Sequence, residues 1–295
     1  MIRLIAIDLD GTLFNSQQQI TPTNKQAVQR AFESGVRIAI VTGRGCIGAE
    51  RALEMLDMDL PYVCSAGSLA REGRQGPTLY AHSFHRPKDL RHLFDFSRRS
   101  GVGLVADLPE GYAIWFGPDS MNAAMDPMSA SDARNSRRTL DPEKELDRPI
   151  LKITAVAEME LLQQVEQLVR ENCPALHQTY SGLRYIDMTA QGVNKGTALK
   201  ALAEHWKLEP GEIAAIGDQE IDIEMLKFSG LPVAMANAVE PLQRAAKWIA
   251  PSNDEDGVAW ALDEIVRSNR LGHDPRVKVR YTKIKRGHKQ GLADS

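Results

Sequence analysis

The chain has 295 residues, 43% of them hydrophobic and 25% charged, with a formal net charge of -3. At about 150 residues per domain, this length predicts two domains, each large enough to bury a core. No apolar run approaches the roughly 18 residues needed to span a bilayer, and the amino terminus meets acidic residues too early for a signal peptide. We therefore expect a cytoplasmic protein with no membrane partner.

The charge is unevenly distributed. Residues 271–295 contain seven Lys or Arg and two Asp, which leaves 29 basic and 37 acidic residues, a net charge of -8, for residues 1–270. An acidic body of this kind is not the electrostatic footprint of a nucleic-acid-binding protein. The basic tail alternates apolar residues at Val277, Val279 and Tyr281, so it is either an edge strand or a disordered arm. Nucleic acid is expected as a partner only through this tail.

The three cysteines exclude two kinds of site. Cys46, Cys64 and Cys173 are far apart and show no CxxC or Cys/His spacing. This pattern argues against both a disulfide framework and a zinc site. We expect all three to be small buried or half-buried residues.

In chain order, the first predicted element is a short apolar strand, Leu4 to Ile7, that ends in Asp8, Asp10 and Gly11. A continuous apolar run of this length is typical of a strand that is buried on both faces. At the carboxyl end of a parallel strand, its two carboxylates would stand in the crevice where open α/β sheets bind ligands. They would lie close enough together to share a divalent cation. Asp10-Gly11 alone is a common turn signal.

Strands then alternate with helices. A helix is predicted over residues 21–35, where Thr21 and a following proline mark its start, and the next strand, residues 36–41, ends in Thr42 and Gly43. A further helix leads to a strand at residues 62–64. This alternation predicts a Rossmann-like parallel sheet with its site along one edge.

From about Thr78 the pattern changes to clustered short strands. Beyond this point we expect a solvated loop over 118–149, a helix over 158–170, and strands over 150–156, 177–180 and 183–187. These elements suggest an α+β module inserted into an α/β core. The predicted boundaries are residues 1–83 and 190–270 for the core, 84–189 for the insert and 271–295 for the basic tail.

The core resumes at Lys195, which opens a helix, and a strand at residues 213–216 is followed by Asp218 and Asp222. Each polar residue has a simpler interpretation: Lys195 as a surface lysine, Asp218 as an N-cap, Asp222 as a first-turn acid, and Thr42 as a turn residue. Their placement favours function, because each lies at a strand exit or a helix start on the edge marked by Asp8.

Phosphoryl transfer needs a nucleophile, an acid/base group and positive charge around the transferred group. Our hypothesis is that Asp8 attacks phosphorus and forms an aspartyl-phosphate. Asp10 would protonate the departing alcohol and then activate water. Thr42, the backbone N–H groups near Gly43, and Lys195 would bind the phosphate oxygens.

The same set of residues offers a magnesium site. Asp8, Asp218 and Asp222, with the main-chain carbonyl of Asp10, supply hard oxygen ligands for Mg²⁺. The charge of the ion would allow three carboxylates to coexist and an anionic substrate to approach them.

These segments resemble the four motifs of the haloacid dehalogenase (HAD) phosphohydrolases, in order: DLDGT with Asp8 and Asp10, Thr42 in VTGR, Lys195 in GVNKG, and Asp218 and Asp222 in GDQEID. The insert between the second and third motifs, and the ending AMANA followed by SNDEDGVA, are similar to the Cof-like (type IIB) branch. In that branch the insert is a cap over the active site. The resemblance implies a Mg²⁺-dependent phosphatase of small phosphorylated metabolites, usually sugar phosphates or phosphorylated cofactors.

Three positions depart from the Cof-like pattern: Ile221 and Ala66 each replace an asparagine, and Ala236 replaces a glycine. Isoleucine cannot hydrogen-bond to phosphate or to metal-bound water. Losing one hydrogen bond to a charged group costs about 1.5 to 3 kcal/mol, which corresponds to roughly one to two decades in rate. The sequence therefore predicts a slow or differently tuned enzyme.

Two functional hypotheses follow. The first is the Mg²⁺-dependent phosphatase, and the second is a catalytically weak phospho-ligand-binding or regulatory protein, which Ile221, Ala66 and the basic tail would allow. Specificity would lie on the face of the insert, where the candidate contacts are Tyr112, Trp115, Tyr180 and Arg184. Residues of these four kinds are more often found in the core or at the rim than in contact with substrate.

Overall fold

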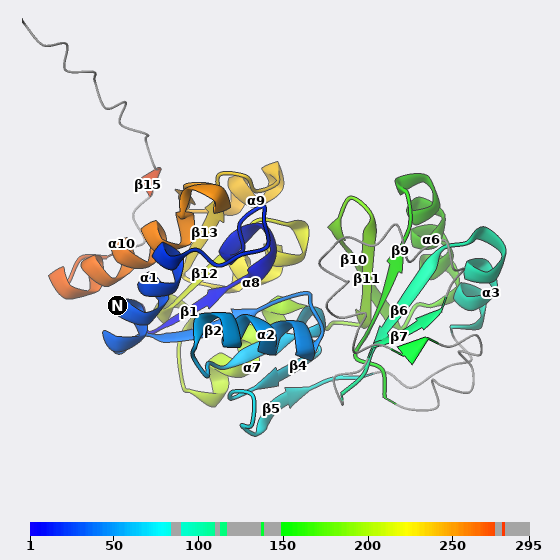
Figure 1. Cartoon of the computed structure of the whole chain (residues 1–295), viewed down its shortest axis with the longest axis horizontal. Helices are drawn as coiled ribbons and strands as arrows, with labels where there is room; N and C mark the ends of the chain where they lie inside the picture. The colour runs from blue at the N-terminus through cyan, green and yellow to red at the C-terminus, as the bar shows by residue number, and fades with distance from the viewer. Residues whose placement is uncertain (84–89, 110–112, 117–136, 139–148, 275–278, 281–295) are drawn as a thin grey trace, which may run out of the picture.

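The computed structural model of the chain describes residues 1–83, 90–109, 113–116, 137–138, 149–274 and 279–280. Two sheets with their helices lie next to one another (Figure 1). One contains both the start of the chain and its last described helix, and the other is built from the middle of the chain. The first is the core and the second, from β6 to β11, is called the insert below.

The core sheet has nine described strands in the order β15-β14-β13-β12-β1-β2-β3-β4-β5. The pairs from β15 to β3 are parallel, whereas β4 and β5 are antiparallel additions at one edge. The strands are β1 (Leu4–Ile7), β2 (Arg37–Val41), β3 (Tyr62–Cys64), β4 (Leu69–Arg71), β5 (Thr78–Ala81), β12 (Ile213–Gly217), β13 (Leu231–Met235), β14 (Trp248–Ala250) and β15 (Val279–Arg280).

Strand β1 lies between β12 and β2 and is the centre of the core. All four of its residues are 0% exposed, as expected for a strand covered on both faces. Fully burying a side chain of the Leu or Ile type stabilises the fold by about 1.5 to 3 kcal/mol. The apolar run that the sequence shows before Asp8 is therefore the element that fixes the position of Asp8.

Helices of the core pack in pairs, α1 against α10 and α7 against α8. The Thr21 side chain accepts the Asn24 N–H at the start of α1, and buried Asn24 Oδ1 accepts the Ala259 N–H of α10 at 2.9 Å. The helices are α1 (Pro22–Glu33), α2 (Cys46–Leu56), α7 (Lys195–His205), α8 (Ile223–Phe228), α9 (Glu240–Ala245) and α10 (Gly257–Leu271), with short 3-10 turns at Ser65–Gly67, Pro210–Glu212, Glu220–Asp222 and Asn253–Glu255.

The insert forms a six-stranded sheet in the order β10-β11-β9-β6-β7-β8, antiparallel except for β7 and β8. Its strands are β6 (Gly103–Asp107), β7 (Ala113–Phe116), β8 (Arg137–Arg138), β9 (Lys152–Val156), β10 (Leu176–Gly182) and β11 (Tyr185–Ala190). Helices α3 (Arg91–Ser100) and α6 (Met159–Asn172) pack on each other and share an apolar core with this sheet. The predicted fold class, an α/β parallel-sheet core with an inserted α+β unit, is confirmed.

Strand alternation gives the insert sheet two different faces. Ile153 and Ala155 of β9, with Ile186 and Met188 of β11, belong to the apolar core under the two helices. The intervening residues of the same strands are polar and nevertheless buried: Lys152, Thr154, Asp187 and Thr189. The core contacts this polar face, since Lys152 Nζ donates to the Gly43 carbonyl of the core at 2.6 Å.

Several predicted element bounds were wrong. The strand expected over 183–187 is β11, Tyr185–Ala190, and β4 and β14, each only three residues long, were not predicted. Their short length leaves too few residues for a period to appear in the sequence. Most of the loop predicted over 118–149 lies outside the described residues. Of the tail, Val279 and Arg280 form the edge strand β15 beside β14.

Candidate active site

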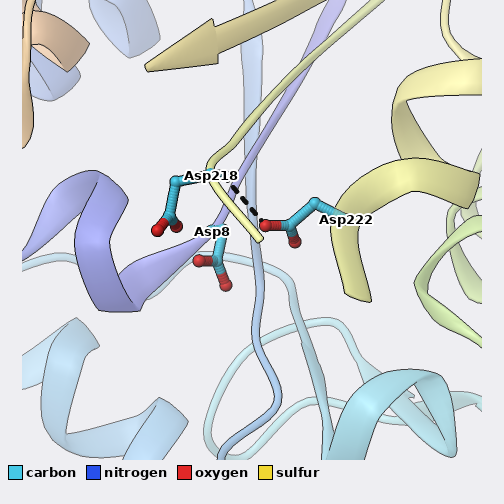
Figure 2. Close-up of side chains that lie close together, drawn as sticks. All are labelled: Asp8, Asp218 and Asp222. Atoms are coloured by element: carbon cyan, nitrogen blue, oxygen red, sulfur yellow. Dashed lines mark hydrogen bonds between the residues drawn. The ribbon is translucent and has the colours of Figure 1, made fainter. Parts of the chain in front are cut away.

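Three carboxylates meet at the carboxyl edge of the core sheet. Asp8 follows β1, Asp218 follows β12, and these two strands are neighbours in register, with Ile7 opposite Ile216. Asp222 comes from the turn that begins at Glu220. One oxygen from each of the three carboxylates lies within 4.8 Å of the other two. Figure 2 shows the three side chains gathered around one point.

Lys195 is the cation of this cluster. Its Nζ lies 2.6 Å from Asp8 Oδ1 and 2.6 Å from Asp222 Oδ1, and the residue is only 1% exposed. Lys195 is the first residue of α7, and this start is fixed by a capping box between Asn194 and Thr197. The alternative of a surface lysine is therefore wrong.

The cluster holds more negative charge than its lysine neutralises. Burial and the neighbouring Asp222 raise the pKa of Asp8 well above its usual value. Burial, followed by Asp222, raises the pKa of Asp218 to about 7. Burial alone would lower the pKa of Lys195, but Asp222 and Asp8 raise it above its usual value. A site of three carboxylates and one ammonium has the donor oxygens and the uncompensated charge that suit a divalent cation.

Local hydrogen bonds fix the orientation of the second and third carboxylates. Asp218 accepts from Thr12 Oγ1 at 3.0 Å, and Asp222 Oδ2 accepts the N–H groups of Asp218 and Gln219, each at 3.0 Å (dashed for Asp218 in Figure 2). Gly11 has φ +71°, and a Cβ at this position would lie 2.3 Å from Asp218 Oδ2. The glycine after Asp10 is therefore required by both its conformation and the close approach of Asp218.

Asp10 lies outside the three-carboxylate cluster of the described residues. Its carboxylate forms a two-point ion pair with Arg44, whose Nε and Nη2 donate at 2.8 and 2.6 Å. The Arg44 guanidinium also lies 4.8 Å from the centre of the Phe14 ring. No role for Arg44 was predicted from the sequence. Its position two residues after Thr42, at the end of a strand, could have indicated a functional residue.

Thr42 directly follows β2 and is fully buried. Its Oγ1 accepts the Arg44 N–H at 3.1 Å. A hydroxyl that accepts in this way can still donate its own proton to another group. The carbonyl of the adjacent Gly43 accepts a hydrogen bond from Lys152 of the insert at 2.6 Å.

A cavity lies between core and insert next to these residues. On the side of the core, the residues that line it include Ala66, Asn194 and Ile221. On the side of the insert, it is lined by His177, Thr179, Asp187 and Thr189. Sequence reasoning missed His177 and Thr179. The two-residue period of β10 places them on one face, opposite to Tyr180.

Of the four candidate substrate contacts, two pair within the insert. Tyr180 donates to Glu166 at 2.9 Å, and Arg184 lies 2.9 Å from Glu158. Neither is among the residues that line the cavity. Tyr112 lies outside the described residues, and Trp115 belongs to β7. Two of the contacts chosen from the sequence, Tyr180 and Arg184, are therefore not among the residues that form the wall of the cavity in the structure.

The three departures from the Cof-like pattern lie in different surroundings. Ile221 and Ala66 line the cavity, and Ala66 adopts a left-handed conformation with φ +57°. Ala236 is exposed, and its carbonyl accepts from Gln243 at 3.0 Å. Only the first two are placed where a missing side-chain hydrogen bond would affect a bound ligand.

This fold is that of haloacid dehalogenase-like hydrolases. The family of that description matches residues 5–262, and the chain belongs to it.

Two curated relatives extend over nearly the whole chain. A Bacillus subtilis protein named 5-amino-6-(5-phospho-D-ribitylamino)uracil phosphatase YwtE is 26% identical and covers 90% of this chain and 98% of its own. A Streptococcus pyogenes protein is 31% identical and covers 88% of this chain and 97% of its own. The chain is accordingly an enzyme of the phosphoric monoester hydrolase class.

Solved structures show the same fold. A haloacid dehalogenase-like hydrolase from Bacteroides thetaiotaomicron is 26% identical, with a TM-score of 0.78 over 90% of this chain and 100% of that one. A subclass IIB sugar phosphatase of 20% identity has a TM-score of 0.75 over 89% and 98% of the two chains. The predicted haloacid dehalogenase family is confirmed, and the likeness to the subclass IIB sugar phosphatase is one of fold. No helix within the described residues is long and apolar enough to cross a membrane.

Proposed function

We propose that the protein is a Mg²⁺-dependent phosphatase that hydrolyses small phosphorylated metabolites, a sugar phosphate or a phosphorylated cofactor, through an aspartyl-phosphate on Asp8. The observation that carries the proposal is the buried cluster of Asp8, Asp218 and Asp222 around Lys195, at the strand ends where this fold binds ligands.

In the first step an Asp8 oxygen attacks phosphorus, and the bond from phosphorus to the ester oxygen breaks. Asp10, placed beside Arg44, would act in its protonated form and give that proton to the departing oxygen. In the second step Asp10 takes a proton from the water that attacks the phosphorus of the aspartyl-phosphate, which releases phosphate and regenerates Asp8. The Thr42 hydroxyl, the backbone at Gly43 and the Lys195 ammonium bind the phosphoryl oxygens.

Asp8, Asp218, Asp222 and the main-chain carbonyl of Asp10 would hold Mg²⁺. When bound, the ion supplies positive charge that reduces repulsion between the carboxylates and the phosphoryl group. The proposed arrangement assigns the Asp10 carbonyl to the metal and the Asp10 carboxylate to proton transfer. The pairing of that carboxylate with Arg44, apart from the cluster, supports this division.

We propose the insert, residues 84–189, as a cap, residues 1–83 and 190–270 as the catalytic core, and residues 271–295 as a basic tail. The cavity between insert and core is where the leaving group would lie. The substrate in the Bacillus relative's name is a small phosphorylated molecule, which supports the proposed class.

Metal removal tests the proposed function. The protein should hydrolyse p-nitrophenyl phosphate in the presence of Mg²⁺, and EDTA should lower the rate by about 100-fold or more, because the carboxylate cluster then repels the substrate. Restored activity on adding excess Mg²⁺ is the control for irreversible damage. Equal rates with Mg²⁺ and with EDTA would contradict metal dependence, and a screen of phosphorylated metabolites would then identify the leaving group of any metal-free reaction.

The second candidate, a catalytically weak phospho-ligand-binding protein, is favoured by Ile221. This side chain is 8% exposed and approaches Gly43, since a Cβ on that glycine would lie 3.5 Å from Ile221 Cδ1. It therefore places an apolar group beside the proposed phosphate-binding loop.

Ile221→Asn should raise kcat by about tenfold, because one hydrogen bond to a charged group is worth about 1.5 kcal/mol or more. Steady-state kinetics on p-nitrophenyl phosphate measures the change. Ile221→Leu, which keeps an apolar side chain of equal size, is the matched control and should leave kcat near the wild-type value. A rate for Ile221→Asn at or below that of Ile221→Leu would show that the isoleucine does not limit turnover.

A further inference from the structure

Lys152, the first residue of β9, is buried where the insert meets the core. It is 7% exposed, and its Nζ donates to the Gly43 carbonyl at 2.6 Å. The same atom lies 3.1 Å from Asp187 Oδ1 and 3.6 Å from Asp107 Oδ2, both residues of the insert. Lys152 is thus a cation of the insert that reaches the backbone of the loop after β2.

Strand register explains how the insert assembles this group. Asp107 of β6 lies opposite Lys152, and Asp187 of β11 lies opposite Thr154, so all four side chains share the polar face of the sheet. Asp187 accepts from Thr154 Oγ1 at 2.6 Å, and Asp107 accepts from Ser65 Oγ of the core at 3.0 Å. Both carboxylates therefore hold the ammonium in place while one of them also contacts the core.

Stability alone is a weak reason for such a group. Removing a lysine and two carboxylates from water costs several kcal/mol per ion, and an apolar contact of similar volume is often as stable. The position of the ammonium on one particular carbonyl instead indicates a role for that peptide group.

The peptide that joins Gly43 to Arg44 connects Lys152 to the catalytic residues. Its carbonyl accepts from Lys152, and its N–H donates to Thr42 Oγ1 at 3.1 Å. The side chain that follows, Arg44, holds Asp10 through two hydrogen bonds. Hydrogen bonds in such a chain polarise one another, so fixing the carbonyl also strengthens the bond from the N–H.

We propose that Lys152 is a positioning residue: by holding the Gly43 carbonyl, it sets the peptide that orients the Thr42 hydroxyl and the Arg44–Asp10 pair when the insert lies on the core. This inference rests on the proposed function for the roles of Thr42 and Asp10. If Lys152 has this role, the Thr42 hydroxyl is aligned for phosphate binding only when the insert is docked on the core.

Kinetics of Lys152→Met test the inference. The variant should lose about 10- to 100-fold in kcat, the effect of one misplaced donor in the transition state, with KM changed less than about threefold. Lys200→Met, an exposed lysine of α7, is the matched control and should behave as wild type. In the double variant with Thr42→Val, the two losses should not add, because both act through the same hydroxyl. Fully additive losses, or a change in KM alone, would overturn the proposal.

A second variant separates positioning from charge. Lys152→Met combined with Asp107→Asn removes one positive and one negative group, so the net charge of the cluster is unchanged while the bond to Gly43 is lost. It should show the same loss of kcat as Lys152→Met. Wild-type kcat in this double variant would overturn the proposal, because the lysine would then matter only as a counter-ion.

Amide hydrogen exchange provides a readout that needs no turnover. The Arg44 amide should exchange at least about tenfold faster in Lys152→Met than in the wild type, because its peptide is no longer held. Amides of β12 and β1, in the same folded protein, are the internal control and should be unchanged. Faster exchange at Arg44 in Lys152→Met, together with a wild type that has no phosphatase activity, would contradict the proposed function but support the positioning role. Equal exchange at Arg44 in the variant and the wild type would contradict the positioning role itself.

Discussion

Asp8→Asn should lower phosphatase turnover by at least about 10³-fold, because an amide oxygen cannot serve as the nucleophile and losses of this size or larger follow removal of a covalent catalyst. The substitution keeps the shape of the side chain. It also leaves an oxygen that can accept a hydrogen bond from Lys195, whose Nζ lies 2.6 Å from Asp8 Oδ1 in the wild type. The measurement is kcat for p-nitrophenyl phosphate with saturating Mg²⁺.

The same variant should not be less stable than the wild type when metal is absent. The raised pKa of Asp8, caused first by burial and then by Asp222, means that its charged form is disfavoured in the folded protein. A neutral asparagine removes that penalty, so thermal unfolding in EDTA should occur at an equal or higher temperature. Asp95→Asn, at an exposed acid of α3, is the matched control for both measurements. Turnover by Asp8→Asn within tenfold of the wild type would exclude Asp8 as the nucleophile.

Lys195→Met should cause the largest loss of stability of any single substitution in the site. The ammonium is 1% exposed and bonds to two carboxylates, so its removal leaves Asp8, Asp218 and Asp222 buried together with no cation among them. Removing one partner of a buried ion pair costs about 3 to 5 kcal/mol. Urea unfolding in EDTA measures this loss, and activity should fall with it because Lys195 is also proposed to bind the phosphoryl group.

Lys200→Met again supplies the control, since an exposed lysine should change the free energy of unfolding by no more than about 0.5 kcal/mol. Mg²⁺ should restore more stability to Lys195→Met than it adds to the wild type, because the ion replaces the missing positive charge. If Lys195→Met were as stable as Lys200→Met in EDTA, the carboxylates would be neutral in the folded protein, and the charged cluster described above would be wrong.

Much of the site could be predicted from the sequence because its residues follow apolar strands. A strand such as Leu4–Ile7 has to be buried, and the first polar residue after it has to stand at the sheet edge. The same reasoning applies to Thr42 after β2 and to Asp218 after β12. Their convergence required only that neighbouring strands be parallel, which alternating strands and helices already indicated.

The ion pair between Asp10 and Arg44 and the contact between Lys152 and Gly43 could not be predicted in this way. The residues of each pair are 34 and 109 positions apart in the chain. A period in the sequence shows which side chains share a face, but it does not show which polar groups on two separate faces will meet. For the same reason the sequence did not show that Tyr180 and Arg184 pair with Glu166 and Glu158 and lie away from the wall of the cavity.

The sequence by itself determined most strands of the core and the order of the polar residues at their ends, and from these the phosphatase class was predicted. Only the tertiary structure decided the role of the polar face of the insert. Alternation in β9 and β11 is typical of a strand with one face in water, yet Lys152 and Asp187 are 7% and 4% exposed. They are buried because the core packs against that face. How the core and the insert pack depends on the shape and charge of both surfaces. A local pattern in the sequence of one surface does not show which surface will cover it.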